Sequence, residues 1–139
     1  MNPVVHFEMP YEDQARMKRF YETAFGWKAN VLGPEMGDYV VVMTSEHGAT
    51  GPKEPGRIDG GFFKKSKDTQ TPSIVIAVDD IHEAMKKVTE TGGTVLDGST
   101  GNGEPDEIPG VGLYAGIIDT EGNRVSLLQP TPRMSAHPE

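Results

Sequence analysis

The fold is decided by two stretches of sequence 67 residues apart, DQARMKRFYETAFG at 13–26 and DIHEAMKKVTETGG at 80–93. Each begins with an aspartate that can cap a helix and ends with a glycine that can stop one. Apolar side chains recur between these ends at helical spacing, as Met17, Phe20 and Tyr21 do in the first stretch. The shared spacing predicts the two helices of an internal repeat.

Alternating or β-branched runs flank both helices and predict strands. In the first half they lie at 4–9, 27–31, 39–43 and 58–63, and in the second at 73–78, 94–96, 113–118 and 124–129. Glycine-rich and proline-rich segments at 46–57 and 98–112 are predicted to be loops. Each half therefore has the order βαβββ, which predicts an α+β fold.

A chain of 139 residues fits one domain with a single core. We assign residues 1–130 to this domain, with module one at 4–63, a polar linker at 64–72 and module two at 73–130; the proline-rich residues 131–139 are predicted to be a loose tail. A helix can cover only one face of each small sheet. Two modules curled together would leave the other faces lining a shared cup.

Composition excludes several classes of function. The chain has no cysteine, so it has no disulfide, thiolate metal ligand or cysteine nucleophile, and it fits a reducing cytoplasm. No apolar stretch approaches the ~20 residues of a membrane span, and no secretory signal is evident. The net charge is -8, and the one dense basic run, at 64–67, has no interleaved aromatics. We predict a cytoplasmic protein that binds neither membrane nor nucleic acid.

Short motifs occur in order along both halves. The first half has VHFEMP at 5–10 and FGW at 25–27, and the second has VDDI at 78–81, GGT at 92–94 and DTEGNR at 119–124. Together they resemble the vicinal oxygen chelate superfamily of glyoxalases, bleomycin resistance proteins and extradiol dioxygenases, in its uncharacterised glyoxalase-like branch. The resemblance implies two βαβββ modules forming a curved mixed sheet around a cup. It also implies a homodimer and, in many members, a divalent metal in the cup.

The resemblance places metal ligands on the first and last strands of each module. His6 matches the first-strand position of module one, and Ser73 lies 67 residues further on. Ser126 occupies the last-strand position of module two. The repeat then gives Asp59 as its partner in module one, or Gly60 if the loop slips by one residue.

The number of suitable ligands argues against the usual metal. A zinc, nickel or iron site needs three or four nitrogen, carboxylate or thiolate ligands, and serine hydroxyls are poor substitutes. We therefore predict no cofactor. The alternative is an atypical site for Zn, Ni, Fe or Mn, built from His6, Glu8 and Asp59.

Strand alternation puts His6 and Glu8 on the face away from the helix, together with Ser73 in module two. With Asp59, these two residues form the candidate catalytic set, since histidine titrates near neutrality and a buried carboxylate can serve as a base. Two structural alternatives remain. His6 could be an ordinary hydrogen-bonded residue, and Glu8 could be one half of a salt bridge, with Arg124 as its partner.

Other residues are candidates for ligand contact. Ser73 and Ser126 occupy cup-facing positions, Tyr114 and Phe62 could form an aromatic wall, and Gly60 leaves room against the sheet. Packing in the core is the alternative for both aromatic residues.

The remaining histidines, His47, His82 and His137, share no predicted face with His6. Trp27 is predicted to serve the core or a dimer interface. The acidic loop at 98–107 is either a lid or a surface loop.

Three functions remain open at this point. The first is a metal-independent small-molecule-binding protein or a cryptic lyase or isomerase. The second is a metal-dependent lyase or dioxygenase with the atypical site. The third is a drug-sequestering resistance protein of the bleomycin-resistance type, whose acidic groove would attract cationic drugs.

Overall fold

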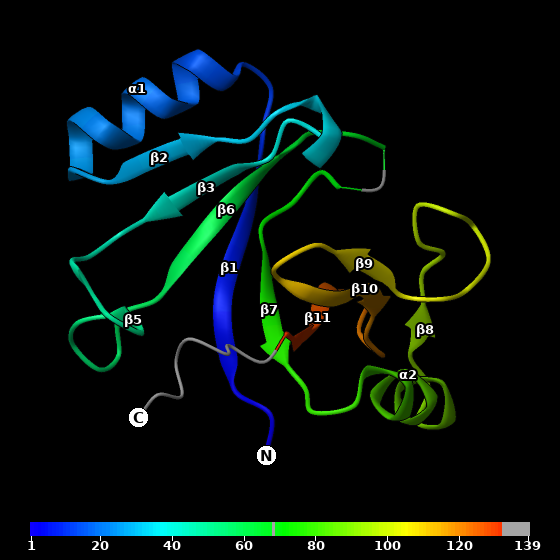
Figure 1. The fold of residues 1–139 in the computed structure, drawn as a ribbon. Helices are drawn as coiled ribbons and strands as arrows, with labels where there is room; N and C mark the ends of the chain where they lie inside the picture. Colours follow the sequence, from blue (N-terminus) through cyan, green and yellow to red (C-terminus); the bar gives the residue numbers. More distant parts are fainter. Residues whose placement is uncertain (68, 132–139) are drawn as a thin grey trace. The chain divides into compact units, whose positions relative to one another are not determined.

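The computed structural model describes residues 1–67 and 69–131 and divides the chain into two compact units (Figure 1). One unit is His6–Pro72, called module one below, and the other joins Met1–Val5 to the chain from Ser73 onward, called module two. Both mix helix and strand, as the α+β prediction requires. The predicted tail, apart from its first residue, lies outside the described residues, and so does His137.

Module one contains a four-stranded mixed sheet in the order β2-β3-β6-β1, in which β1 and β6 run parallel and β3 is antiparallel to both of its neighbours. A short hairpin interrupts the predicted loop at 46–57 and forms a separate small sheet. The elements are β1 (Val4–Tyr11), α1 (Gln14–Phe25), β2 (Lys28–Val31), the 3₁₀ turn η1 (Pro34–Met36), β3 (Val40–Met43), β4 (His47–Gly48), β5 (Gly51–Pro52) and β6 (Asp59–Lys64).

Module two repeats this plan with the sheet order β7-β11-β10-β8, and β9 also pairs with β10. Strand β9 lies inside the segment predicted to be a loop at 98–112, where the acidic sequence gave no strand signal. The elements are β7 (Ser73–Ala77), α2 (Ile81–Glu90), β8 (Thr94–Val95), β9 (Asp106–Ile108), β10 (Gly112–Ile118) and β11 (Arg124–Pro130).

Both helices begin where the sequence predicts. The Asp13 carboxylate accepts a hydrogen bond from the Arg16 backbone N–H at 2.9 Å, and Asp80 accepts one from the Glu83 N–H at 3.1 Å. Gly26 ends α1 in the left-handed conformation with φ 73°, which glycine adopts without a steric penalty. Helix α2 ends earlier than predicted, with Thr91 as its C-cap.

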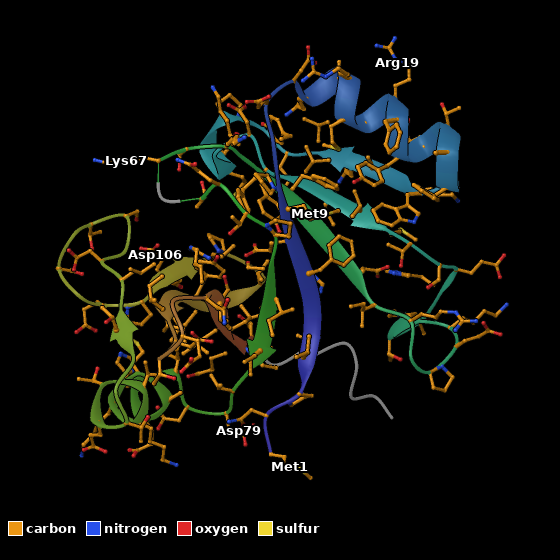
Figure 2. The ribbon with its side chains drawn as sticks, turned by 180° about the vertical axis from the view of Figure 1, so that it is seen from behind. Met1, Met9, Arg19, Lys67, Asp79 and Asp106 are labelled. Atoms are coloured by element: carbon orange, nitrogen blue, oxygen red, sulfur yellow. The ribbon has the colours of Figure 1, made fainter. Side chains whose placement is uncertain are left out.

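Each helix packs on its own sheet through a separate apolar cluster, while the outer face of α1 carries residues such as Arg19, which projects away from the sheet (Figure 2). The buried members are Tyr11, Val40, Val42 and Phe62 in module one, and Val78, Ile81, Ala115, Ile117 and Leu127 in module two. Phe7 and Met9 pack against the first cluster, which confirms the predicted alternation along β1. No helix in the described part of the chain is long and apolar enough to cross a lipid bilayer.

Candidate functional site

The candidate catalytic residues of module one lie on the sheet face turned away from α1. In the parallel pair β1–β6, His6 is opposite Asp59 and Glu8 is opposite Gly61, and residues paired in this way share a face. Glu8 and Asp59 are 5% and 7% exposed. The structure therefore brings His6, Glu8 and Asp59 together on two adjacent strands.

Asp59 is held by two donors from the segment that precedes it. Its Oδ1 accepts a hydrogen bond from the Thr44 backbone N–H at 2.9 Å, and its Oδ2 is paired with Nε2 of His47. A buried carboxylate needs such partners, because its desolvation is otherwise costly. His47 thus belongs to the same cluster as Asp59, although the sequence gave no reason to place it there.

Glu8 is bonded to a tyrosine that closes the space over a glycine. The Tyr39 hydroxyl donates to Glu8 Oε2 at 3.0 Å. The same phenol lies over Gly61, where a Cβ atom would overlap the tyrosine hydroxyl. Gly61 is therefore required for the close approach of Tyr39 to the sheet.

Gly60 and Phe62 lie on the opposite face, so their predicted role in ligand contact needs revision. A Cβ on Gly60 would lie 2.6 Å from the Phe7 ring, and Phe62 is 2% exposed with its ring 5.1 Å from that of Tyr21. Trp27 stacks on Tyr21 at 4.8 Å beside the same cluster. The alternation of β6 directs these groups to the helix side, and we place them in the core.

The matching face of module two is polar and carries a cation. Ser126 is fully buried, and its Oγ lies 2.7 Å from the Tyr114 hydroxyl and accepts a hydrogen bond from Arg124 Nη1 at 3.0 Å. The Arg124 guanidinium lies against Gly116, where a Cβ would be 2.7 Å from Nη2. Tyr114, Arg124 and Ser126 thus form one connected cluster on β10 and β11.

Two buried polar atoms at this face have no hydrogen-bond partner among the described residues: Ser73 Oγ and Arg124 Nε. Ser126 is opposite Val75 in the parallel pair β7–β11, so the same register places Ser73 opposite Arg124. Within the described ranges, Arg124 also makes no ion pair with a carboxylate. Buried polar atoms are rarely left unsatisfied in native proteins. This face is therefore suited to receive an acceptor group from outside the protein.

The strand registers correct the predicted repeat partner of Ser126. Glu8 and Val75 are 67 residues apart and are equivalent on the first strands, where Glu8 is opposite Gly61 and Val75 is opposite Ser126. The equivalent of Ser126 is therefore Gly61, and neither Asp59 nor Gly60. The offset of 67 fails at the last strands because the connections that precede them differ in length.

The chain resembles known proteins in sequence over its beginning and in fold over nearly its whole length. Residues 4–45 match the family described as bleomycin resistance protein-like N-terminal. The hypothetical protein BH1468 from Bacillus halodurans C-125 is 16% identical, with a TM-score of 0.64 over 95% of this chain and 96% of its own. No functionally curated protein matches the chain by sequence.

Two structures of methylmalonyl-CoA epimerase are similar in the same way. The complex with methylmalonyl-CoA and NH4+ is 12% identical, with a TM-score of 0.65 over 94% of this chain and 96% of its own. The Mycobacterium tuberculosis enzyme is 13% identical, with a TM-score of 0.62 over 96% and 91%. This chain has the vicinal oxygen chelate fold. The resemblance predicted from the sequence is thereby confirmed.

The residues at the metal positions of vicinal oxygen chelate proteins do not fit a divalent metal here. The last-strand positions hold Gly61, which has no side chain, and Ser126, whose Oγ is 3.0 Å from a guanidinium nitrogen that would repel a second cation. The atypical alternative also loses a ligand, because both Asp59 oxygens are already engaged. Among the residues that the structure describes, no group of three histidine or acidic side chains could hold a metal.

Sequence reasoning missed three residues of these faces: Tyr39, Thr44 and His47. Tyr39 precedes a strand and gives no signal beyond its aromatic ring. Thr44 acts through its backbone, which no motif reveals. His47 lies in a glycine-rich and proline-rich segment, where periodicity cannot show which way a side chain points.

The acidic loop predicted as a lid or surface loop is partly ordered by its own hydrogen bonds. Asp106, labelled in Figure 2, accepts from the Ser99 backbone N–H at 3.0 Å and from the Ser99 hydroxyl at 2.9 Å. Asp106 is opposite Tyr114 in the β9–β10 pair. The bond to Ser99 therefore ties one end of the loop to the edge of the module-two sheet.

Proposed function

We propose that this protein binds a small organic anion without a metal, and that Arg124 and Ser73 hold the anionic group on the face of module two. The observation that carries the proposal is the pair of buried donors without partners, Ser73 Oγ and Arg124 Nε among the described residues. A carboxylate or similar oxyanion supplies acceptors to both and a countercharge to the guanidinium. Ser126 and Tyr114 support the site by orienting Arg124.

The similar structures are consistent with this class of ligand. One of them is a complex with methylmalonyl-CoA, a thioester that carries a free carboxylate. At 12% identity this likeness extends to the fold alone. It suggests methylmalonyl-CoA and methylmalonate as first probes, and propionyl-CoA, which lacks the carboxylate, as a matched comparison.

Drug sequestration is the second candidate, because the matching family is described as bleomycin resistance protein-like. Two buried carboxylates of module one, Glu8 and Asp59, and a net charge of -8 would favour a cationic ligand. A cationic glycopeptide would engage these acids and would gain nothing from Arg124. The two candidates therefore differ in which module their affinity depends on.

One calorimetric titration series separates these candidates. We expect methylmalonyl-CoA or methylmalonate to bind chelator-treated protein, propionyl-CoA to bind more weakly, and Arg124→Met to weaken the carboxylate ligands at least about tenfold. Arg19→Met, an exposed cation on α1, is the matched control and should change nothing. No binding by either carboxylate, or binding that ignores Arg124→Met, contradicts the proposal. Tight binding of bleomycin that survives Arg124→Met would support sequestration instead.

A further inference from the structure

A second cavity lies within module one, beside the hairpin β4–β5. Its volume is about 570 Å³, a size suited to a small organic ligand. It is lined by the start of β2, the end of β3 and the hairpin, including Lys28, Thr44, Ser45, His47 and Lys53. None of these residues forms part of the Arg124 face.

His47 enters this cavity with its ring already oriented. Nε2 is paired with the buried Asp59 carboxylate, which the Thr44 backbone N–H also anchors. Because an ionised carboxylate can only accept, Nε2 carries the hydrogen and Nδ1 remains the free ring nitrogen. The His47 side chain is 35% exposed, so the ring is accessible from the cavity.

A second, independent observation points to a ligand at the same place. Ser45 also lines the cavity, and its Oγ is buried without a hydrogen-bond partner in the described part of the chain. A buried hydroxyl without a partner is costly unless something supplies one. The cavity therefore contains an unsatisfied donor as well as an oriented imidazole.

The charges around the cavity favour an anion, against the charge of the whole chain. Lys28 makes no ion pair with the described residues, and Lys53 Nζ lies 3.8 Å from Glu46 Oε1, with both side chains exposed. Such an exposed pair is weak. The lining thus has two lysines against one glutamate, in a protein of net charge -8.

We propose that this cavity is a second binding site, for a small carboxylate or phosphate, in which Ser45 and His47 contact the ligand and Lys28 and Lys53 neutralise it. Asp59 is the positioning residue, since it acts by fixing the His47 ring. The site is independent of the anion site at Arg124.

Carbon-detected or proton-detected NMR of the histidine rings tests the site. The neutralised probes are propionate, succinate and inorganic phosphate at constant pH. We expect at least one of them to shift the His47 ring signals with a saturating dependence on concentration. His82 is exposed and ion-paired with the exposed Glu104 at 3.3 Å, so it reports general salt effects in the same sample.

Variants then assign the effect to the cavity. Lys28→Met, Lys53→Met and Ser45→Ala should each weaken the saturating shift of His47 several-fold, whereas Lys86→Met, an exposed lysine on α2, and Arg124→Met should leave it intact. The proposal is overturned if His47 merely follows His82 for all three probes. It is also overturned if saturation persists unchanged in the three cavity variants. Because Arg124→Met is a control here, this result and that of the Arg124 site are decided separately.

Discussion

The two modules keep the same core but differ on their other face. By strand register, the buried Val40, Val42 and Phe62 of module one correspond to Ala115, Ile117 and Leu127 of module two. All six are apolar and buried on the helix side. The repeat therefore preserves what packs the helices.

On the face away from the helices, the equivalent positions carry opposite chemistry. Asp59 of module one corresponds to Arg124 of module two, and Gly61 corresponds to Ser126. The tyrosines Tyr39 and Tyr114 are themselves equivalent when the β3–β6 register is extended by one residue. One tyrosine covers a glycine and binds an acid, and the other binds a serine beside an arginine. The scaffold is thus duplicated, while the site is divided into an acidic and a basic half.

The connections before the last strands explain how this difference arises. Residues 44–58 join β3 to β6, whereas residues 119–123 join the equivalent strands β10 and β11. The longer segment includes the hairpin that supplies His47 to Asp59. The shorter one is a tight turn that brings nothing to the face. Module one therefore has a histidine and a cavity for which module two has no equivalent.

The largest effect should come from breaking the shared core. Phe62→Ala and Leu127→Ala should each lower the free energy of unfolding, by about 3–5 and about 2–5 kcal/mol respectively, because they leave cavities at equivalent buried positions. Phe20→Ala, at a 56% exposed site on α1, should cost much less. Urea denaturation measures all three. A large loss in only one of the two core variants would show that the cores are not equivalent.

A smaller effect should come from changing Gly61, which has no side chain where module two has Ser126. Gly61→Ala should destabilise the protein by about 1–3 kcal/mol, because the new methyl group overlaps the Tyr39 phenol. In a Tyr39→Ala background the same change should cost clearly less, since the space is then open. An equal cost in both backgrounds would mean that Tyr39 does not limit this position.

Much of the fold could be predicted because it depends on local signals. The caps Asp13 and Asp80 and the alternation of Phe7 with Glu8 are visible in the sequence, since each reflects contacts within a few residues. Short β9, Asp106–Ile108, was missed because three acidic and apolar residues give no measurable period.

The candidate site could be predicted only in part, because it depends on register. The shared face of His6, Glu8 and Asp59 follows from alternation alone. The equivalence of Gly61 with Ser126 does not, because it requires the lengths of two different connections to be known in three dimensions. The pairing of His47 with Asp59 was likewise hidden, since a glycine-rich segment can return to the sheet in many ways.

The smallest effect concerns the short connection of module two. Asp119 accepts hydrogen bonds from the backbone and side chain of Asn123 and from the Glu121 N–H, and these bonds lower the pKa of its carboxyl below the ordinary 3.8. A depressed pKa in the folded state means that the ionised form stabilises the fold. This stability is fully present above the unfolded value and is lost as the pH falls through the folded value.

We therefore expect Asp119→Asn to lower the melting temperature at pH 7 and to have little effect below the folded pKa, where the natural carboxyl is also neutral. Glu107→Gln, an exposed acid on β9, removes the same charge and should show no such dependence. Melting curves from pH 7 down to about pH 2 measure the difference. If Asp119→Asn costs the same at both ends of this range, the turn is held by its shape rather than by its charge. The short connection would then resemble the long one, in which the geometry around Asp59 positions the groups.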